Sequence, residues 1–466
     1  MMIMDITILL WLVLLVLNGI FCQVITLTKQ DPCTPLSAGN SSIDDVPAIS
    51  QALITCGNGG TIIIRAGEIF MIRSPLDFRN CIGCNFQIEG TLKVLDDIDY
   101  WEGKTAFFLM TNVVGGTFHS LTGSGLIDGS GQAFWDYFAI NKTYERPLLI
   151  QFSNSSNIIF TKIKLIDPAF WFIFITNNSM NIKLSDLVLS AVSTSQNRPK
   201  NTDGFDTGEC SHISISNIHV TNGDDCVSFK YGSDYITVNN ITCIGSHGLS
   251  VGSLGMKPDH PYTVKNIYVS NAKMINSTTA TRIKFFPGGP SHGTVIVRNV
   301  TFKDVIVDNC DYALQVDNCY ESNVTTCKEY PSAAELSNIR FININGKTSK
   351  KYDPNIAKIN CPPSGTCDIT FIQWDIVAPS GNSTVLCSDY HNPSGIICKG
   401  ATSSASFLFR NSFLLILILR VGVSILMLPH PPSHPQGFSL FLFILYCCFL
   451  FYFFLSRKTY TNFMFI

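Results

Sequence analysis

A short pattern of apolar and polar positions recurs through the middle of the chain. Each copy opens on a polar residue, alternates Ile, Leu or Val with polar residues, passes a second polar position and alternates again. Alternation of period two predicts two short β-strands joined at a polar bend in each copy. The copies follow one another at spacings of 24, 31, 23, 31, 33, 39 and 30 residues, and they open at Asn157, Asn181, His212, Tyr235, Asn266, Asn299, Asn338 and Asp368.

One such strand pair cannot bury its apolar face alone, whereas stacked copies share a continuous core. Long helical patterns are nearly absent, and glycines fall at the strand ends. The sequence therefore predicts an all-β fold, a parallel β-helix (solenoid) of about ten coils, rather than a β-sandwich, which needs no coil-length period. Asn217 and Asn240 hold the same bend position in adjacent copies, so we expect their side chains to stack. Cys33 and Cys56 are candidates to staple the cap that the N-terminal end of the core requires.

The N-terminus carries a short apolar run, from Ile6 to Leu17, followed by a candidate cleavage point near Cys22. We interpret residues 1–22 as a secretory signal peptide, although Asp5 stands where a basic residue is usual. A membrane anchor is the alternative, but the run is shorter than the roughly 20 residues that a span needs. Residues 23–400 then form the β-helix domain.

The character of the chain changes after Gly400. No Asp or Glu occurs there, 12 of the 33 Phe do, and two apolar runs lie at residues 413–428 and 438–455. A membrane anchor or a lipid-anchor signal would explain one such run. Because residues 401–466 neither continue the repeat nor share its cysteine and glycosylation patterns, we favour sequence that a wrong gene model or read-through has appended.

The composition of the whole chain suits an exported protein. Charged residues make up 14%, and the net charge is -2 with 32 basic and 34 acidic residues, so no basic excess suggests a nucleic-acid partner. Of the 17 cysteines, 14 lie between residues 23 and 400, an even number that suits disulfides in an oxidising compartment. Asn-x-Ser/Thr motifs are glycosylated only in the secretory pathway, and they occur at Asn40, Asn141, Asn154, Asn177, Asn240, Asn276, Asn299, Asn323 and Asn382.

Three carboxylates stand out in this charge-poor chain, in two motifs about one coil apart. Asp203 closes an Asn-Thr-Asp motif, and Asp224 and Asp225 follow 21 and 22 residues later in a Gly-Asp-Asp motif. His247 comes 22 residues after Asp225. Residues one coil apart in a solenoid are stacked neighbours, so we expect these four side chains on one surface. Asp-Gly pairs are also ordinary turn chemistry, but three motifs in register by coil length argue against turns alone.

Arg282 and Lys284 add two cations, which strand alternation places on one face. Cleavage of a glycosidic bond needs a protonated acid at the leaving oxygen and a carboxylate that activates water or attacks the sugar. Crowded carboxylates resist sharing negative charge, so one pKa should rise, which supplies the acid. The cations suit an anionic sugar, because guanidinium matches a carboxylate in a forked geometry. To Asp206, beside Gly208, we assign a structural role.

Taken in order, the Asn-Thr-Asp, Gly-Asp-Asp, Gly-Ser-His-Gly and Arg-Ile-Lys segments resemble the four signature segments of the polygalacturonase family, glycoside hydrolase family 28, over roughly residues 31–399. The resemblance implies a right-handed parallel β-helix and hydrolysis with inversion. It makes Asp224 the general acid, and it makes Asp203 and Asp225 the residues that position and activate water. His247 would support the protonation of the acid.

The same resemblance assigns residues around these motifs. Arg282 and Lys284 would bind the galacturonate carboxylate, and Asn201 and Tyr320 are further candidates for substrate contact. Three disulfides are implied, of which the first would brace the loops of the acids and of the histidine: Cys226–Cys243, Cys361–Cys367 and Cys387–Cys398. We expect no cofactor and no metal.

The segment from Ser246 to Gly255 is most similar to exo-polygalacturonases, and Ser246 stands where endo-acting members usually carry Gly. We therefore predict a secreted, monomeric exo-polygalacturonase of the cell wall that releases galacturonate from the chain ends of pectin. An endo-polygalacturonase and a xylogalacturonan hydrolase are alternatives within the family. A calcium-dependent pectate lyase and a non-catalytic carbohydrate-binding β-helix are alternatives of other kinds. We also expect an acidic optimum, because Asp224 must be protonated while its neighbours are not.

Overall fold

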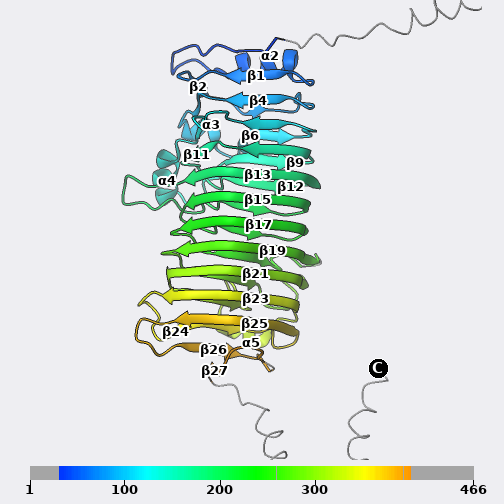
Figure 1. Ribbon diagram of the computed structural model, residues 1–466, viewed down its shortest axis with the longest axis vertical. Coiled ribbons are helices and arrows are strands. Elements are labelled where there is room, and N and C mark those ends of the chain that lie inside the picture. Colours follow the sequence, from blue (N-terminus) through cyan, green and yellow to red (C-terminus); the bar gives the residue numbers. More distant parts are fainter. Residues whose placement is uncertain (1–30, 259, 392, 400–466) are drawn as a thin grey trace, which may run out of the picture. The chain divides into compact units, whose positions relative to one another are not determined.

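The computed structural model describes residues 31–258, 260–391 and 393–399, which form a parallel β-helix (Figure 1). Two sheets run along the stack of coils, one of 15 strands and one of 12. Each sheet is parallel throughout its long central run, for example between β13 (Ser179–Ser190), β15 (Cys210–Thr221) and β17 (Ser233–Ile244). Parallel strands in one sheet are joined by right-handed crossovers. The predicted right-handed parallel β-helix is confirmed.

The remaining strands divide between the two sheets. The 15-stranded sheet also contains β1(Thr61–Ile64), β2(Ile69–Ile72), β4(Asn85–Ile88), β5(Thr91–Val94), β7(Thr117–His119), β8(Leu126–Asp128), β10(Ser156–Thr161), β11(Lys164–Ile166), β19(Tyr262–Ile275), β21(Val295–Cys310), β23(Glu335–Thr348) and β25(Thr366–Val377). The 12-stranded sheet contains β3(Leu76–Asp77), β6(Ala106–Thr111), β9(Leu148–Ser153), β12(Ile173–Thr176), β14(Phe205–Thr207), β16(Val227–Phe229), β18(Leu249–Leu254), β20(Thr279–Phe285), β22(Tyr312–Asp317), β24(Asn355–Asn360), β26(Thr384–Ser388) and β27(Cys398–Lys399).

The polar bends predicted from the repeat lie inside the long strands. The two short strands β10 and β11 pair with the two halves of β13, so two strands of one coil match one bent strand of the next. Asn217 sits at the bend of β15 with φ of 57°, a left-handed conformation that Asn tolerates well. The Nδ2 of Asn240 donates a hydrogen bond to Oδ1 of Asn217 at 2.9 Å. The expected stack of these two side chains is confirmed.

The core consists of inward-facing apolar side chains that stack from coil to coil. Ile213, Ile236 and Ile267 are register partners on β15, β17 and β19, and all three are buried. The polar residues between them point outward, which gives the alternation that the sequence displays. Helix α2 (Val46–Cys56) packs against β1, β2 and β3 at the N-terminal end of the core.

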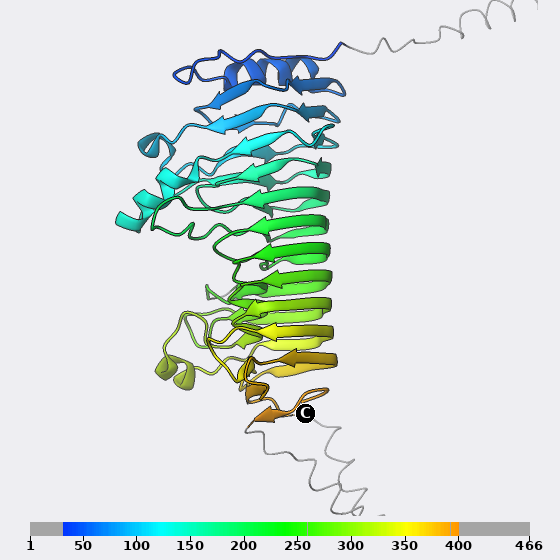
Figure 2. The same cartoon turned by 60° about the vertical axis from the view of Figure 1, so that its left-hand side comes forward.

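Three further helices, α3 (Ile98–Trp101), α4 (Gly131–Ile140) and α5 (Val324–Glu329), lie in connections between strands. Figure 2 shows α4 and α5 projecting from the same side of the coil stack. The loops that follow β13, β15 and β17 leave the 15-stranded sheet on that side too, as the strand directions indicate in both views. This edge carries the candidate chemistry.

Six disulfides join the described cysteines. Cys33–Cys56, Cys226–Cys243, Cys361–Cys367 and Cys387–Cys398 match the expected pairs, and the other two are Cys81–Cys84 and Cys319–Cys327. The even number of cysteines suggested complete pairing, but Cys210 and Cys310 are buried free thiols. Both belong to the hydrophobic core, where a free cysteine packs as a small apolar side chain.

The predicted signal peptide at residues 1–22 and the hydrophobic tail at residues 401–466 lie outside the described residues. Within the described ranges, no helix has the length and apolar character that a membrane crossing requires.

Candidate active site

The three aspartates and the histidine singled out in the sequence lie on successive coils. Phe205, Val227 and Leu249 are register partners at the starts of β14, β16 and β18. Asp203, Asp225 and His247 each precede one of these partners by two residues, so they occupy equivalent positions one coil apart. The backbone confirms the contact, because Gly204 N–H donates to the Asp225 carbonyl at 3.0 Å.

Asp224 lies between two predicted neighbours. Its Oδ1 is 2.9 Å from Nδ1 of His247, and its Oδ2 accepts a hydrogen bond from Nδ2 of Asn201 at 3.2 Å. The carboxylate of Asp224 is 15% exposed and the imidazole of His247 is 37% exposed. Of the three acids, Asp224 therefore combines a hydrogen-bonded imidazole with access to solvent, which a proton donor to a bound sugar requires.

Asp225 is buried in an ion pair. Its Oδ2 lies 2.7 Å from Nζ of Lys284, and its Oδ1 accepts a hydrogen bond from Oγ of Ser250 at 2.7 Å. Both partners of the ion pair are almost fully enclosed. Lys284, which we expected to bind the substrate carboxylate, thus has an acid of the site as its direct partner. The ion pair with Lys284 and the hydrogen bond from Ser250 fix the orientation of the Asp225 carboxylate.

Asp203 is buried and its Oδ1 has no hydrogen-bond partner in the described part of the chain. A buried carboxylate oxygen without a partner is costly unless water or a ligand reaches it. This atom therefore suits the binding of a water molecule. Asp206, to which we assigned a structural role, is fully buried and pairs with Lys230, whose Nζ lies 3.0 Å from its Oδ1.

The predicted binding residues cluster around the ring of Tyr320. The guanidinium of Arg282 lies 5.3 Å from the ring centroid and Nζ of Lys284 lies 5.1 Å from it. Arg282 is 3.9 Å from the carboxylate of Asp317, and its Nε has no hydrogen-bond partner among the described residues. Arg282 therefore keeps hydrogen-bonding capacity for an anionic ligand, whereas Lys284 is already paired.

The family assignment rests on a match between this chain and a family model. The profile described as "Glycosyl hydrolases family 28" matches residues 26–398. The chain belongs to this family.

Sequence relatives and a solved structure agree with that membership. Endo-xylogalacturonan hydrolase A of Aspergillus tubingensis is 47% identical over 371 residues, which cover 80% of this chain and 91% of that protein. Probable endo-xylogalacturonan hydrolase A of Aspergillus flavus is 44% identical over 378 residues, covering 81% of this chain and 93% of that protein. The crystal structure of endo-xylogalacturonan hydrolase from Aspergillus tubingensis matches with a TM-score of 0.78 and 46% identity, over 80% of this chain and 100% of that chain.

A polygalacturonase from Erwinia carotovora is 20% identical with a TM-score of 0.62, over 79% of this chain and 99% of that chain, so it shares the fold. The family 28 protein described here is a glycoside hydrolase.

Burial and charge separate the acids of this family 28 site. Burial raises the pKa of Asp203 well above its usual range, and the negative charges of Asp206, Asp224 and Asp225 raise it further. Burial also acts to raise the pKa of Asp224, but the hydrogen bond and charge of His247 outweigh it, so the pKa is lowered. Burial raises the pKa of Asp206 to about 6, against the opposing charge of Lys230.

We expected crowding to raise the pKa of the general acid Asp224, but in the structure this pKa is lowered. The raised pKa belongs to Asp203, with burial as its largest cause, whereas the contact with His247 lowers the pKa of Asp224. Asp224 Oδ1 and His247 Nδ1 lie 2.9 Å apart and share one hydrogen bond, along which a proton can move between the two groups. Asp224 can therefore hold a transferable proton through His247 rather than through crowding alone.

Asp224, Asp225 and His247 bring ligand atoms within 4.8 Å of one another, the geometry of a possible metal site. Asp225, however, already binds the ammonium of Lys284 and the hydroxyl of Ser250. A divalent cation would have to displace the lysine and break the bond between Asp224 and His247. The donor set therefore suits proton transfer better than cation binding.

Two basic residues of the site were missed in the sequence. Arg146 is buried, and its guanidinium donates to Oδ1 of Asn201 at 2.9 Å, which orients the amide that contacts Asp224. The aromatic rings of Phe138 and Phe170 lie 3.8 and 4.9 Å from that guanidinium. Lys230, which pairs with Asp206, is the second basic residue that was missed. Neither belongs to a recurring motif, and Arg146 comes from a connection 55 residues before Asn201, so no spacing rule pointed to them.

Proposed function

We propose that this chain is an endo-acting hydrolase of the α-1,4-galacturonide bonds in xylose-substituted pectin. The observation that carries the proposal is the row of Asp203, Asp224 and Asp225 on adjacent coils, with His247 2.9 Å from Asp224. The relatives that carry the name endo-xylogalacturonan hydrolase, at 44% and 47% identity, favour this substrate within the family.

The expected exo action rested partly on Ser246. That residue is buried, and its hydroxyl contacts Oγ of Ser277 at 3.2 Å. Its place is therefore explained by packing between coils, and it supplies no wall that would close one end of a substrate groove. Exo action stays a prediction of the sequence, and we place the endo-acting alternative first.

In the proposed mechanism, Asp224 donates its proton to the glycosidic oxygen as the bond to the anomeric carbon breaks. Asp203 and Asp225 hold a water molecule on the opposite face of the sugar, and one of the two carboxylates accepts its proton as the water attacks, so the configuration inverts. Lys284 holds the Asp225 carboxylate in position through their ion pair of 2.7 Å. Arg282, beside Tyr320, binds the carboxylate of the galacturonate.

Product analysis on xylogalacturonan and on unbranched polygalacturonate tests the proposal, with Asp224→Asn as the inactive control. We expect a spread of oligomers from xylogalacturonan at early times and slower release from polygalacturonate. Monomer or a single short product from the chain end would support exo action instead. Unsaturated products that absorb in the ultraviolet and vanish with chelator would identify a lyase. If the wild-type protein releases no reducing sugar from either polymer, the hydrolase mechanism fails and the protein only binds carbohydrate.

We further propose that the protein acts outside the cell as a monomer. Six disulfides in the described residues support passage through an oxidising compartment. Mass spectrometry of the secreted protein tests removal of residues 1–22 and the presence of residues 401–466, and light scattering tests the monomer.

A further inference from the structure

On the outer face of the 15-stranded sheet, a row of equivalent positions carries asparagine at both ends and two aromatic residues between them. The positions lie one residue before the register partners Ile213, Ile236 and Ile267, and the row continues in both directions along the coils. All members have a left-handed backbone, with φ between 51° and 58°, and they are Asn157, Asn181, His212, Tyr235, Asn266, Asn299 and Asn338. Five of the seven are asparagines.

Asparagine suits the positions of this row for two reasons. It tolerates positive φ, and its amide links neighbouring coils, as the Nδ2 of Asn299 does when it donates to Oδ1 of Asn266 at 3.0 Å. Asn338 and Asn299 form the same bond at 3.0 Å. His212 and Tyr235 cannot make this amide bond, and a bulky residue at positive φ is an outlier that raises the energy of the fold.

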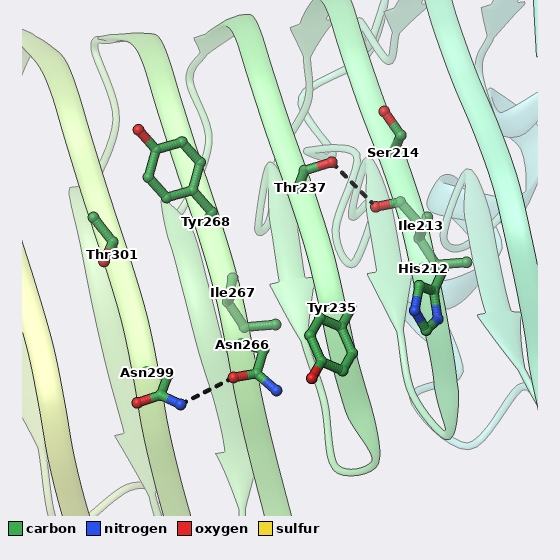
Figure 3. A pocket seen from close by; sticks show the side chains of 10 residues that line it. All are labelled: His212, Ile213, Ser214, Tyr235, Thr237, Asn266, Ile267, Tyr268, Asn299 and Thr301. Carbon is green, nitrogen blue, oxygen red and sulfur yellow. Dashed lines mark hydrogen bonds between the residues drawn. The ribbon is translucent and has the colours of Figure 1, made fainter.

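The two exceptions form an exposed aromatic platform. The rings of His212 and Tyr235 stack with their centroids 5.0 Å apart and their planes 20° apart. Tyr235 is 54% exposed, and Tyr268 on the next coil is 41% exposed. Figure 3 shows His212, Tyr235, Asn266 and Asn299 as one row, and Ser214, Thr237, Tyr268 and Thr301 as a second row beside it.

The two rows line a shallow hollow of about 570 Å³. This volume lies within the range of roughly 300–1,000 Å³ that small-ligand sites occupy. The lining offers ring faces, amides and hydroxyls and contains no acidic or strongly basic side chain. The nearby charges of Asp234 and Lys265 pair with each other at 3.2 Å. Aromatic faces that stack on C–H groups, flanked by neutral hydrogen-bonding groups, match the chemistry of an uncharged sugar.

We propose that this hollow is an accessory binding site for a neutral glycan, whose sugar rings stack on Tyr235 and Tyr268. His212 lies near the start of β15, whereas Asp224 follows the end of that strand beyond the bend at Asn217, so the hollow and the catalytic loops are separate. The site holds the enzyme on uncharged wall polysaccharide while the acids act on pectin. The inference does not depend on which galacturonide bond the active site cleaves.

The row itself supplies a test that does not damage the fold. Tyr235→Asn removes the platform and restores the residue that the left-handed position favours. We expect the thermal midpoint to stay equal or rise, and the rate on polygalacturonate to stay unchanged. Binding of xylohexaose, a neutral oligosaccharide, measured by calorimetry on the secreted protein, should weaken about tenfold or more. Tyr268→Thr, which extends the row of hydroxyl residues, should weaken it similarly.

Tyr352→Asn is the matched control, because Tyr352 is 39% exposed and stacks on Tyr312 at 4.6 Å elsewhere on the surface. The proposal is overturned if the wild-type protein does not bind xylohexaose, if Tyr235→Asn binds it equally well, or if the control variant weakens binding as much. Asn299 also lies in a glycosylation motif. A glycan found on Asn299 by mass spectrometry would mean that the chain's own sugar fills the hollow, which also overturns the proposal.

Discussion

Lys284 and Asp225 form a buried ion pair in which Nζ lies 2.7 Å from Oδ2, with the two side chains 7% and 1% exposed. The pair spans strand β20 and the loop before β16, two coils apart in the 12-stranded sheet. Because Lys284 is enclosed together with Asp225, its ammonium interacts with this acid rather than directly with a substrate. The attraction of Asp225 raises the pKa of Lys284, although burial alone would lower it.

Lys284→Met tests this relationship. Removing one partner leaves an uncompensated buried carboxylate, which costs about 3–5 kcal/mol of stability. We expect kcat to fall more than KM rises in the variant, because Asp225 loses the ion pair that positions it. Arg282→Met, which removes only the longer ion pair of 3.9 Å with Asp317, should instead raise KM and change the thermal midpoint less. Kinetics across pH with thermal melts distinguish the two, and a pure KM effect in Lys284→Met would contradict the positioning role.

His247→Ala tests the pairing of His247 with Asp224. The hydrogen bond and charge of His247 lower the pKa of Asp224, so their loss lets burial raise it. We expect the wild-type rate to fall as pH rises from acidic to neutral, because Asp224, whose pKa is lowered, loses its proton. In His247→Ala, kcat should fall by roughly 10²-fold, and the decline with pH should move upward. A flat wild-type rate across this range, or a decline that does not move in the variant, would contradict this role of His247.

Asp203→Asn should abolish activity and make the thermal midpoint less dependent on pH. The pKa of Asp203 is raised in the folded protein. Its contribution to stability is therefore complete below the unfolded pKa of about 3.9 and is lost as pH rises through the folded pKa. We expect the thermal midpoint of the wild type to decline over this range and that of Asp203→Asn to decline less, although the variant is inactive.

Asp224→Asn is the matched control for that experiment, because the pKa of Asp224 is lowered. Its contribution is present above the unfolded pKa and is lost as pH falls through the folded pKa, so this variant should lose stability at neutral pH. Equal pH dependence of stability in both variants would show that the two acids do not differ in this way.

The sequence predicted the fold because a solenoid repeats one local rule. The period-two alternation and the Asn bends depend on neighbouring residues, and the coil length alone placed Asp203, Asp225 and His247 in one row. The pairing of Asp225 with Lys284 was hidden, since 59 residues and two coils separate the two. The direction of the pKa of Asp224 depended on a contact of 2.9 Å with His247, which spacing cannot resolve.

Arg146 is the residue whose role the sequence could not reveal, and its replacement tests the whole chain of contacts behind Asp224. Arg146→Lys keeps a charge but loses the planar fork that reaches both the Lys200 carbonyl, at 2.7 Å, and the Asn201 amide oxygen, at 2.9 Å. We expect Asn201 to lose its orientation and kcat to fall about tenfold, with a smaller change in KM. Asn201→Ala should produce the same loss, and the double variant should be no worse than either single variant, because one path carries the effect. Arg79→Lys, at an exposed ion pair, should have no effect on the rate. Additive losses in the double variant would show that Arg146 acts on the reaction by a route other than Asn201.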